Sequence, residues 1–459
     1  MIRIFNHYLH RRTLIQVLFD LGLIVAAVFA VALSQGSSEH MVTFAASYGL
    51  SLAGGMFVIN SASGLYSQSH KRSLTQSCAR ALFALLIGLP LAYGLFSLIP
   101  ATVSHRDLLT TTAMLAVALV MVHRVYAAHS GAQASGRSKI LIFGTGHAAL
   151  AVSDSLRAAD PHAHIVGFLP GPNEVDPQVP SHQLIPAGES LTDAAMRLGV
   201  DEIVVALSER RGGSMPLRQL LDCKLYGIRV VDLATYFEKT LAQIKISHVH
   251  AGWLIFGDGF NQGVLRSAVK RVFDLVSSLV LLVLSAPVML VTAVLIKLES
   301  PGSIFYTQER VGLNGATFKV IKFRSMRNDA EKDGRPQWAT KNDARVTRVG
   351  NIIRKVRIDE LPQLINVLRG EMSMVGPRPE RPFFVDELVA QIPYYAVRHS
   401  VKPGVTGWAQ VRYEYGSTIE DSLEKLQYDL YYVKNHTLFL DLLIMLETVA
   451  VVLTGRGAR

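Results

Sequence analysis

The feature that most constrains this chain is a long N-terminal segment with very few charged residues. Between Thr13 and Pro100 only five residues carry a charge, which excludes both an ordinary cytosolic enzyme and a disordered polymer. The apolar runs in and beyond this segment cover residues 13–34, 41–65, 81–99 and 108–122. Because about 20 apolar residues cross a bilayer as a helix, we expect residues 1–130 to form a four-helix transmembrane bundle.

Basic residues indicate how this bundle lies in the membrane. They gather before the first run, between the second and third, and after the fourth, whereas Arg106 is the single lysine or arginine in the two remaining loops. The positive-inside rule therefore places both ends of the bundle in the cytoplasm. The first run is too long for the core of a signal peptide and is followed directly by further runs, so we interpret it as an anchor. Asp20 is the one acidic residue inside a run, and we treat the bundle as a passive anchor.

A fifth apolar run, residues 275–296, contains no charged residue and has the length of a membrane-spanning helix. Basic residues flank both of its ends, so the positive-inside rule places both ends on the cytoplasmic face. Ser285 and Pro287 lie at its midpoint, where proline interrupts helical hydrogen bonding and the serine hydroxyl can satisfy a freed carbonyl. We therefore predict a re-entrant, broken helix at about residues 272–298. The alternative is a kinked spanning helix, which would place the C-terminal region outside the cell.

The segment 131–255 alternates β-rich runs with helical ones, a pattern typical of a Rossmann-like α/β domain with a parallel sheet. The expected strands are residues 139–143, 165–169, 202–207 and 228–233. The first strand leads into residues 144–149, a GxGxxA turn of the kind that sets backbone amides against a pyrophosphate. The acid that an NAD site needs after the second strand is missing, since Glu174 comes late and in a turn. A structural or regulatory role is therefore favoured over nucleotide or nucleotide-sugar binding, with redox catalysis least favoured.

Basic residues closely follow the predicted re-entrant helix. Lys322 and Arg324 lie within residues 318–326. So close to a membrane, their side chains would attract the phosphate of a substrate or of a lipid, and we take both as substrate-binding candidates. The alternative is a basic collar on anionic lipid. The net charge of +10 fits basic cytoplasmic loops, and we expect no nucleic-acid partner.

Asp359 and Glu360 are the strongest catalytic candidates. Pro362 is tolerated only in the first turn of a helix, which places both acids at a helix N-terminus, where backbone amides and the helix dipole favour negative charge. Such a pair alone would be interpreted as ordinary capping. Basic and rigid residues surround it in the sequence, namely Arg354, Arg357, Pro377 and Arg378. This setting favours catalysis over capping, with one acid free to attack and the other free to hold a cation.

Three stretches after residue 299 carry a family resemblance. They read SPGSIFYTQERVGLNGATFKVIKFRSM at 300–326, RKVRIDELPQLINVLRGEMSMVGPRP at 354–379 and VKPGVTGWAQV at 401–411. From Lys270 to the C-terminus the chain resembles the bacterial sugar transferases, which are monotopic polyprenyl-phosphate hexose-1-phosphate transferases. Its front resembles the long form of that family. One departure is Ala286, which intervenes where the family often has serine directly before proline.

The resemblance implies a mostly α-helical catalytic domain over residues 265–459 and a reaction in two steps. A UDP-sugar would donate its hexose 1-phosphate to an enzyme aspartate with loss of UMP, and undecaprenyl phosphate would then accept it. This transfer initiates the synthesis of exopolysaccharide, capsule or lipopolysaccharide O-antigen. By the same resemblance, Asp359 would be the nucleophile and Glu360 the principal ligand of Mg²⁺.

The resemblance also implies substrate-binding residues and a location. Arg354 and Arg378, with Pro377 beside the latter, would clamp phosphates or the nucleotide, and Asp429 belongs to a stretch similar to a late family motif. The family implies a multi-pass protein of the bacterial inner membrane, in contact with membrane lipids, whose catalytic domain faces the cytoplasm. The resemblance leaves open whether the protein forms a homodimer. The rival interpretation is a catalytically silent scaffold or regulator of polysaccharide assembly. The intact acids and arginines disfavour it.

Overall fold

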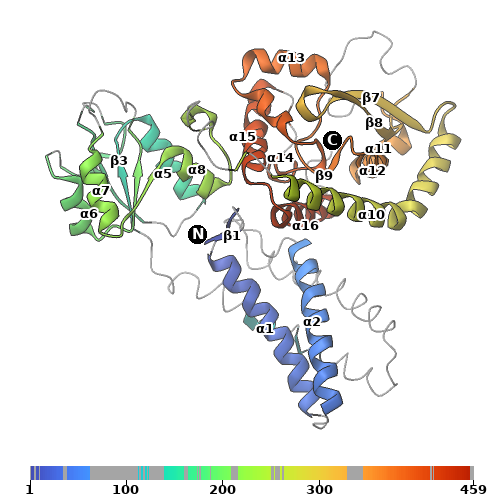
Figure 1. Ribbon diagram of the computed structural model, residues 1–459, viewed down its shortest axis with the longest axis horizontal. Coiled ribbons are helices and arrows are strands. Elements are labelled where there is room, and N and C mark those ends of the chain that lie inside the picture. The colour runs from blue at the N-terminus through green and yellow to red at the C-terminus, as the bar shows by residue number, and fades with distance from the viewer. Residues whose placement is uncertain are drawn as a thin grey trace.

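The computed structural model describes residues 2–4, 7–9, 11–34, 39–62, single positions between 112 and 123, 139–159, 164–207 without 173, 175, 176 and 187, 215–249, 253, 259–260, 263–327, 345–413, 416 and 418–454. These residues form a mixed helical and α/β protein (Figure 1). A helical N-terminal part is followed by a four-stranded α/β part and a mostly helical C-terminal part.

Two long helices dominate the described N-terminal part. The elements are β1 (Ile2–Ile4), β2 (His7–Leu9), α1 (Arg11–Ser34) and α2 (Glu39–Ala62). The helices α1 and α2 run side by side (Figure 1) and share a core that contains Ile24, Val28 and Leu52. The first two predicted apolar runs therefore form helices. The run at 81–99 lies outside the described residues, and only scattered positions of the fourth run are described.

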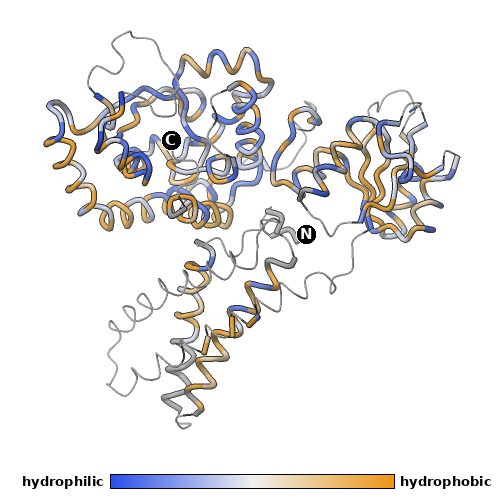
Figure 2. Tube along the Cα trace, turned by 180° about the vertical axis from the view of Figure 1, so that it is seen from behind, coloured by the Kyte–Doolittle hydropathy of each residue, from blue (hydrophilic) through white to orange (hydrophobic). Residues whose placement is uncertain are grey.

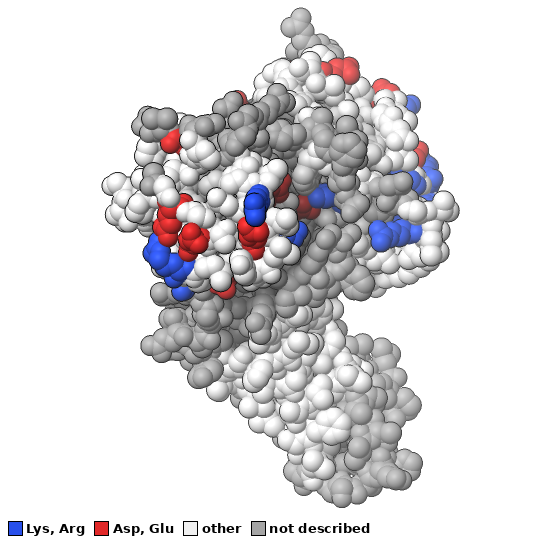
Figure 3. All heavy atoms as spheres, turned by 60° about the vertical axis from the view of Figure 1, so that its left-hand side comes forward, with Lys and Arg blue, Asp and Glu red and all other residues white. Residues whose placement is uncertain are grey.

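Two of the described helices are long and apolar enough to cross a membrane. They are α1, through Leu14–Val31, and α10 (Val264–Glu299). Hydrophobic residues dominate both helices in Figure 2, and Figure 3 shows no charged side chain among the described residues on one face of the α1–α2 stalk. Asp20 is buried within this stalk, and its Oδ1 lies 2.9 Å from Nδ1 of His123. The acid is thus paired within the described N-terminal part.

The α/β part is built on one parallel sheet. Its strands are β3 (Lys139–Phe143), β4 (His164–Leu169), β5 (Glu202–Val205) and β6 (Arg229–Asp232). They lie in the order β4-β3-β5-β6, and every neighbouring pair is parallel. All four predicted strands are therefore present. Apolar residues fill both faces of the central strands because helices cover both sides of the sheet, as expected for parallel strands.

The helices of this part cover the two faces of the sheet in pairs. They are α5 (His147–Ala159), α6 (Leu191–Leu198), α7 (Leu217–Leu225) and α8 (Leu233–Leu241), with a short turn η1 (Ser181–Gln183). One core joins α6 and α7 to the sheet through Leu191 and Leu220. The other joins α5 and α8 to the opposite face through Val152 and Phe237.

The C-terminal part is mostly helical. Its elements are α10, β7 (Phe305–Val311), η3 (Leu313–Gly315), β8 (Thr317–Phe323), α11 (Arg348–Lys355), η4 (Ile358–Glu360), α12 (Gln363–Arg369), β9 (Ser373–Val375), α13 (Pro382–Gln391), η5 (Tyr395–Ser400), β10 (Gly404–Thr406), α14 (Trp408–Arg412), α15 (Ile419–Asn435) and α16 (Leu438–Thr454). Strands β7 and β8 form an antiparallel hairpin, whereas β9 and β10 pair in parallel. One large core, which includes Val367, Met374, Trp408 and Leu430, joins α12, β9, α14 and α15.

Helix α10 bends so that both of its ends contact the C-terminal part. Arg271, near its start, donates to the carbonyl of Val367 in α12 at 2.6 Å. Glu299, its last residue, accepts from the backbone amide of Arg348 in α11 at 2.7 Å. Figure 1 shows the change of direction between these ends, and Pro287 lies within the helix.

Ser285 is predicted to satisfy the carbonyl that Pro287 leaves unpaired. Its hydroxyl lies 3.4 Å from the carbonyl oxygen of Leu282. The carbonyl that loses its partner because of Pro287 is that of Val283, four residues before the proline. The serine therefore reaches the carbonyl next to the one that proline leaves unpaired, through a long and weak hydrogen bond.

The chain that follows α8 packs into the C-terminal core. It includes η2 (Ile246–His248). Ile244 is fully buried there, and its amide donates to the carbonyl of Gln427 in α15 at 3.0 Å. The indole N–H of Trp408 donates to the carbonyl of Ala242 at 2.8 Å. Residues 242–249, here called the strap, thus complete the core around α14 and α15.

Candidate active site

The two candidate acids lie in a tight turn between α11 and α12. Asp359 and Glu360 belong to η4, which the hydrogen bond from Leu361 N to the carbonyl of Ile358 closes at 3.1 Å. Arg357, directly before them, has a φ of 56°, a left-handed conformation that is uncommon outside glycine and lets the chain reverse sharply. Pro362 precedes the first residue of α12. The expected position of the acids at the start of a helix is therefore observed, with a separate short turn in front of α12.

Glu360 is surrounded by cationic side chains. Its Oε1 lies 2.6 Å from Arg378 Nη2 and 3.0 Å from Lys322 Nζ, and Arg357 Nη1 lies 3.6 Å from its Oε2. Burial by itself would raise the pKa of Glu360. The positive charges of Arg378, Lys322 and Arg357 outweigh burial and hold that pKa well below its ordinary value. Glu360 is therefore a stable carboxylate.

Asp359 has the opposite electrostatic environment, although it is the next residue. It is 9% exposed, and among the described residues its carboxylate has no hydrogen-bond or ion-pair partner. Burial first, and the negative charge of Glu360 second, raise the pKa of Asp359 to about 6, against the opposing charges of Lys322, Arg378 and Arg354. Neighbouring acids whose pKa values are pushed apart are a frequent mark of divided catalytic roles.

The loop that carries Arg378 is held rigidly from two sides. Gly376 N donates to the carbonyl of Thr406 at 2.9 Å, and the carbonyl of Pro377 accepts from Gly404 N at 3.0 Å. A side chain at position 376 would collide with the backbone at Lys402, so this close approach requires glycine. The role of Pro377 in the structure is thus to hold the loop, while Arg378 reaches Glu360.

Asp429 supports the Arg378 loop through Arg398. Its carboxylate is 2% exposed and lies 2.8 Å from Arg398 Nη2. Arg398 donates in turn to the backbone carbonyl of Arg378 at 2.8 Å and to the hydroxyl of Tyr395 at 2.6 Å. Burial raises the pKa of Asp429 to about 6, and the charge of Arg398 opposes that shift. The structure therefore places Asp429 behind the Arg378 loop, where it can position Arg378 through Arg398.

The other sequence-predicted residues divide between the site and its surroundings. Lys322, on β8, faces Glu360, and burial lowers its pKa against the charge of Glu360. Arg324 instead donates to the carbonyls of Ser300 and Pro301, both at 2.8 Å, and so holds the turn after α10. Arg354, in the last turn of α11, acts on Asp359 through its charge.

Three arginines shape the site without having been predicted to do so. Arg357 was named only as a neighbour of the acids, and Arg310 and Arg398 were not identified as site residues. Arg357 precedes the acids directly and lies one helical turn before Glu360, a spacing that could have indicated the pair. Arg310, on β7, is half-buried, and its Nη1 lies 3.3 Å from Oε2 of Glu380, the residue that ends the Arg378 loop. Arg398 had no signal in the sequence, because the two partners that connect it to the site, Arg378 and Asp429, lie 20 or more residues away.

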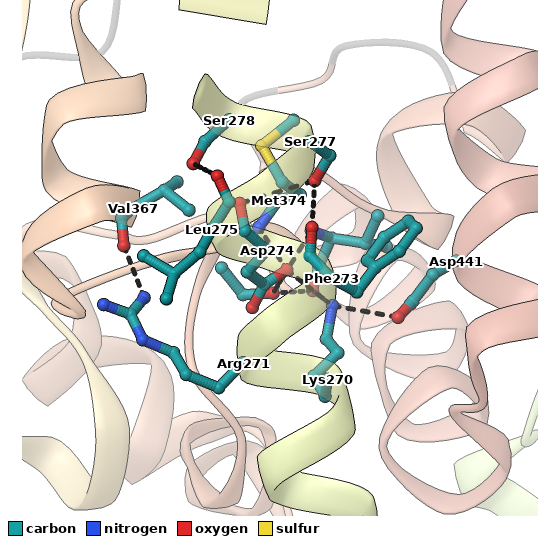
Figure 4. A network of polar contacts seen from close by, with 12 residues as sticks. Lys270, Arg271, Phe273, Asp274, Leu275, Ser277, Ser278, Val367, Met374 and Asp441 are labelled. Carbon is teal, nitrogen blue, oxygen red and sulfur yellow. Dashed lines mark hydrogen bonds and ion pairs between the residues drawn. The ribbon is translucent and has the colours of Figure 1, made fainter. Parts of the chain in front are cut away.

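A buried polar network ties α10 to the strand that leads into the Arg378 loop (Figure 4). Lys270 Nζ lies 3.2 Å from Asp274 Oδ1 and 2.9 Å from Asp441 Oδ2. Asp274 Oδ1 accepts from the amide of Met374 in β9 at 3.1 Å and from the hydroxyl of Ser373 at 3.0 Å. The helix that could enter the membrane is thereby fixed to the part of the chain that carries Arg378.

Comparisons with known proteins point to one family. The family described as "Bacterial sugar transferase" matches residues 265–455. The UDP-N-acetylgalactosamine-undecaprenyl-phosphate N-acetylgalactosaminephosphotransferase of Aeromonas hydrophila is 45% identical over 242 residues, which are 53% of this chain and 56% of that protein.

Two further relatives match the C-terminal part. The UDP-glucose:undecaprenyl-phosphate glucose-1-phosphate transferase of Caulobacter vibrioides is 47% identical over 192 residues, 41% of this chain and 71% of that protein. The exopolysaccharide production protein PSS of Rhizobium leguminosarum bv. phaseoli is 44% identical over 198 residues, 41% of this chain and 98% of that protein. The chain thus spans about half the length of the Aeromonas relative and almost all of the Rhizobium one.

Proposed function

The chain belongs to the bacterial sugar transferase family, and we propose that it transfers a hexose 1-phosphate from a UDP-sugar to undecaprenyl phosphate and releases UMP. The observation that carries the proposal is the contrast between two adjacent buried acids. Glu360 is neutralised by cations, whereas Asp359 is left without a partner among the described residues. A carboxylate without a partner, in a site rich in positive charge, is suited to attack a phosphate.

In the first step, a carboxylate oxygen of Asp359 attacks the phosphorus that carries the sugar. A bond forms between this oxygen and phosphorus, the bond to the bridging anhydride oxygen breaks, and UMP leaves with that oxygen. In the second step, a phosphate oxygen of undecaprenyl phosphate attacks the same phosphorus and releases Asp359 as a carboxylate. One phosphoanhydride is broken and one is formed, so the exchange needs no further energy source.

Positive charge around Asp359 supports both steps. Phosphoryl transfer depends mainly on positioning and on neutralising charge, and Arg378, Lys322 and Arg354 surround the acids. Mg²⁺ binds one or two carboxylates together with substrate phosphates and water, and Glu360 would hold it by exchanging contacts with Lys322 or Arg378 for the ion. Among the described residues no group of three or more metal-binding side chains forms a complete protein cage. Mg²⁺ held by Glu360 would add charge neutralisation at the substrate phosphates.

The proposal also includes the place of the enzyme in the cell. We infer an inner-membrane protein whose front half forms a four-helix bundle and whose Rossmann-like middle domain and catalytic domain face the cytoplasm, with α10 re-entering one leaflet. Both ends of α10 contact the catalytic part, and most apolar side chains between them are exposed, Val283, Leu284 and Leu290 among them. Lipid is the solvent that such a surface favours.

The test is covalent labelling of the protein by a radioactive donor. Purified full-length protein is incubated with UDP-sugars labelled in the β-phosphate, starting with UDP-N-acetylgalactosamine and UDP-glucose, and without acceptor. We expect label on the wild-type protein, its transfer to added undecaprenyl phosphate, and neither event with Asp359→Asn, because an amide is no anionic nucleophile. Asp386→Asn, at an exposed position on α13, is the matched control and should behave as wild type.

Two results would count against the proposal. Turnover by Asp359→Asn close to the wild-type rate would remove Asp359 from its role. A folded protein that transfers none of a full panel of UDP-sugars would favour the rival interpretation, a catalytically silent scaffold of polysaccharide assembly.

A further inference from the structure

The glycine turn of the α/β part already binds an anion, which is the carboxylate of Glu174. The turn joins β3 to α5 and includes Gly144, Thr145 and Gly146. Oε2 of Glu174 accepts from the Thr145 amide at 2.6 Å and from the Thr145 hydroxyl at 2.9 Å. The same oxygen accepts from the amide of Gly171 at 3.2 Å. A single carboxylate oxygen thus collects three donors.

The backbone around this carboxylate forms a closed cradle. Gly144 has a φ of 130°, and a side chain there would lie 2.6 Å from the carbonyl oxygen of Ala206, so only glycine fits. Beyond β4, Gln178 contacts the turn, and its amide donates to the carbonyl of Thr145 at 2.8 Å. Thr145 is fully buried. The loop that would carry a ribose-binding acid in a dinucleotide site instead delivers its acid to the phosphate position.

The carboxylate fills the cradle only in part. Oε1 of Glu174 is buried and has no hydrogen-bond partner among the described residues, although a buried carboxylate oxygen without a donor is unfavourable. A terminal phosphate group presents three oxygens and more charge at the same position, beside the N-terminus of the 13-residue helix α5. The cradle therefore has the donors of a diphosphate site, and Glu174 blocks it.

We propose that the carboxylate of Glu174 is the built-in occupant of an anion site in the glycine turn, and that this site accepts a diphosphate group only when the carboxylate is removed. The α/β part of the wild-type chain accordingly binds no dinucleotide at this turn. Its contribution is structural, since the closed turn fixes the end of the sheet from which the chain continues to α8 and the strap.

Hydrogen–deuterium exchange of the full-length protein, read by mass spectrometry on peptides that cover residues 139–150, tests the proposal locally. This readout separates the turn from the catalytic site, which also attracts phosphates. In Glu174→Ala the peptide should exchange about tenfold faster or more, as expected for the loss of a charge-assisted hydrogen bond. Sodium pyrophosphate should restore protection in this variant and leave the wild type unchanged, with sodium chloride at equal ionic strength as the control.

Matched variants keep the test decisive. Glu189→Ala removes a carboxylate of the same domain that pairs with Arg197 on the surface, and it should exchange and respond as wild type. Glu174→Gln retains the size of the side chain and serves if the alanine variant does not fold; its protection should rise with pyrophosphate, though less than in the alanine variant. Either of two results overturns the proposal: pyrophosphate protects neither variant, or it protects the wild-type turn as strongly as the turn of Glu174→Ala.

Discussion

The strap predicts where the chain can be cut without losing the catalytic part. A protein that starts at Asn261 contains every candidate site residue but lacks residues 242–249. It therefore loses the buried side chains of Ile244 and Val249, which are 0% and 8% exposed in the C-terminal core. It also leaves the indole N–H of Trp408 without the carbonyl of Ala242. A protein that starts at Thr240 retains all three contacts.

The magnitude follows from these contacts. Burial of one such aliphatic side chain is worth about 1.5 to 3 kcal/mol, and a buried donor left without its acceptor costs about 1 to 3 kcal/mol. Together the losses are about 4 to 9 kcal/mol, which is comparable to the whole free energy of unfolding of an ordinary domain, about 5 to 15 kcal/mol. We expect the Asn261 protein to unfold at a much lower temperature than the Thr240 protein, and its transferase activity to be largely lost.

The assay compares both truncations with the full chain in the same detergent, by thermal unfolding and by transfer to undecaprenyl phosphate. Trp408→Phe in the full chain is a graded control, because it removes the N–H donor and part of the buried ring but leaves Ile244 and Val249 in place; it should lower the midpoint of unfolding less than the truncation at Asn261 does. Equal midpoints and equal activities for the two truncations would refute the reasoning. Inactivity of the Asn261 protein alone would not place the α/β part in the active site, since the strap explains it.

Three further predictions concern the acids. Transfer should slow as the pH falls through about 6, because burial raises the pKa of Asp359 to about that value and only its carboxylate can attack; a pH–rate profile checks this. Because that pKa lies above its ordinary 3.8, the folded state loses stability as the pH rises from about 4 to 6, so Asp359→Asn should have a higher midpoint of unfolding than wild type at about pH 8 and not at about pH 4. Asp429→Asn should raise the donor KM about tenfold, because Arg398 loses the charge-assisted hydrogen bond that holds it against the carbonyl of Arg378. Glu420→Gln, at an exposed position on the same helix, should leave the KM unchanged; an unchanged KM for Asp429→Asn would remove the ion pair from this role.

Local sequence patterns were sufficient where near neighbours determine the conformation. The predicted strands end within two residues of the observed ones, because β-rich runs between helical runs fit only the interior of a parallel sheet. The position of Asp359 and Glu360 followed from one proline, since Pro362 restricts the backbone on both sides of itself. The opposite pKa shifts of these two acids could not be predicted from the sequence, because they depend on which cationic side chains lie next to each acid in the folded chain.

Partners far apart in the sequence could not be predicted. Arg324 lies among other basic residues, and only the folded chain shows that it binds the turn at Ser300 while Lys322 turns to the acids. Asp429 and Arg398 are a buried pair whose members belong to α15 and η5. A charged side chain has many possible partners in an unfolded chain, and the approach of elements distant in sequence selects among them. The local periodicity of the sequence therefore does not show which partner a charged side chain binds.

The contacts of α10 join this long apolar helix to the candidate active site. A straight helix of its 36 residues would be about 54 Å long, well beyond the hydrocarbon thickness of about 30 Å. Yet Lys270 near one end is fixed to Asp441 of α16, and Glu299 at the other end is fixed to the first turn of α11. Since both anchors belong to the same catalytic part, the proposed insertion of the apolar segment between them would have to be re-entrant, with Pro287 inside that segment. In that proposed arrangement, the depth of insertion would set the height of β9, and with it that of Arg378, above the lipid surface from which the proposed acceptor presents its phosphate.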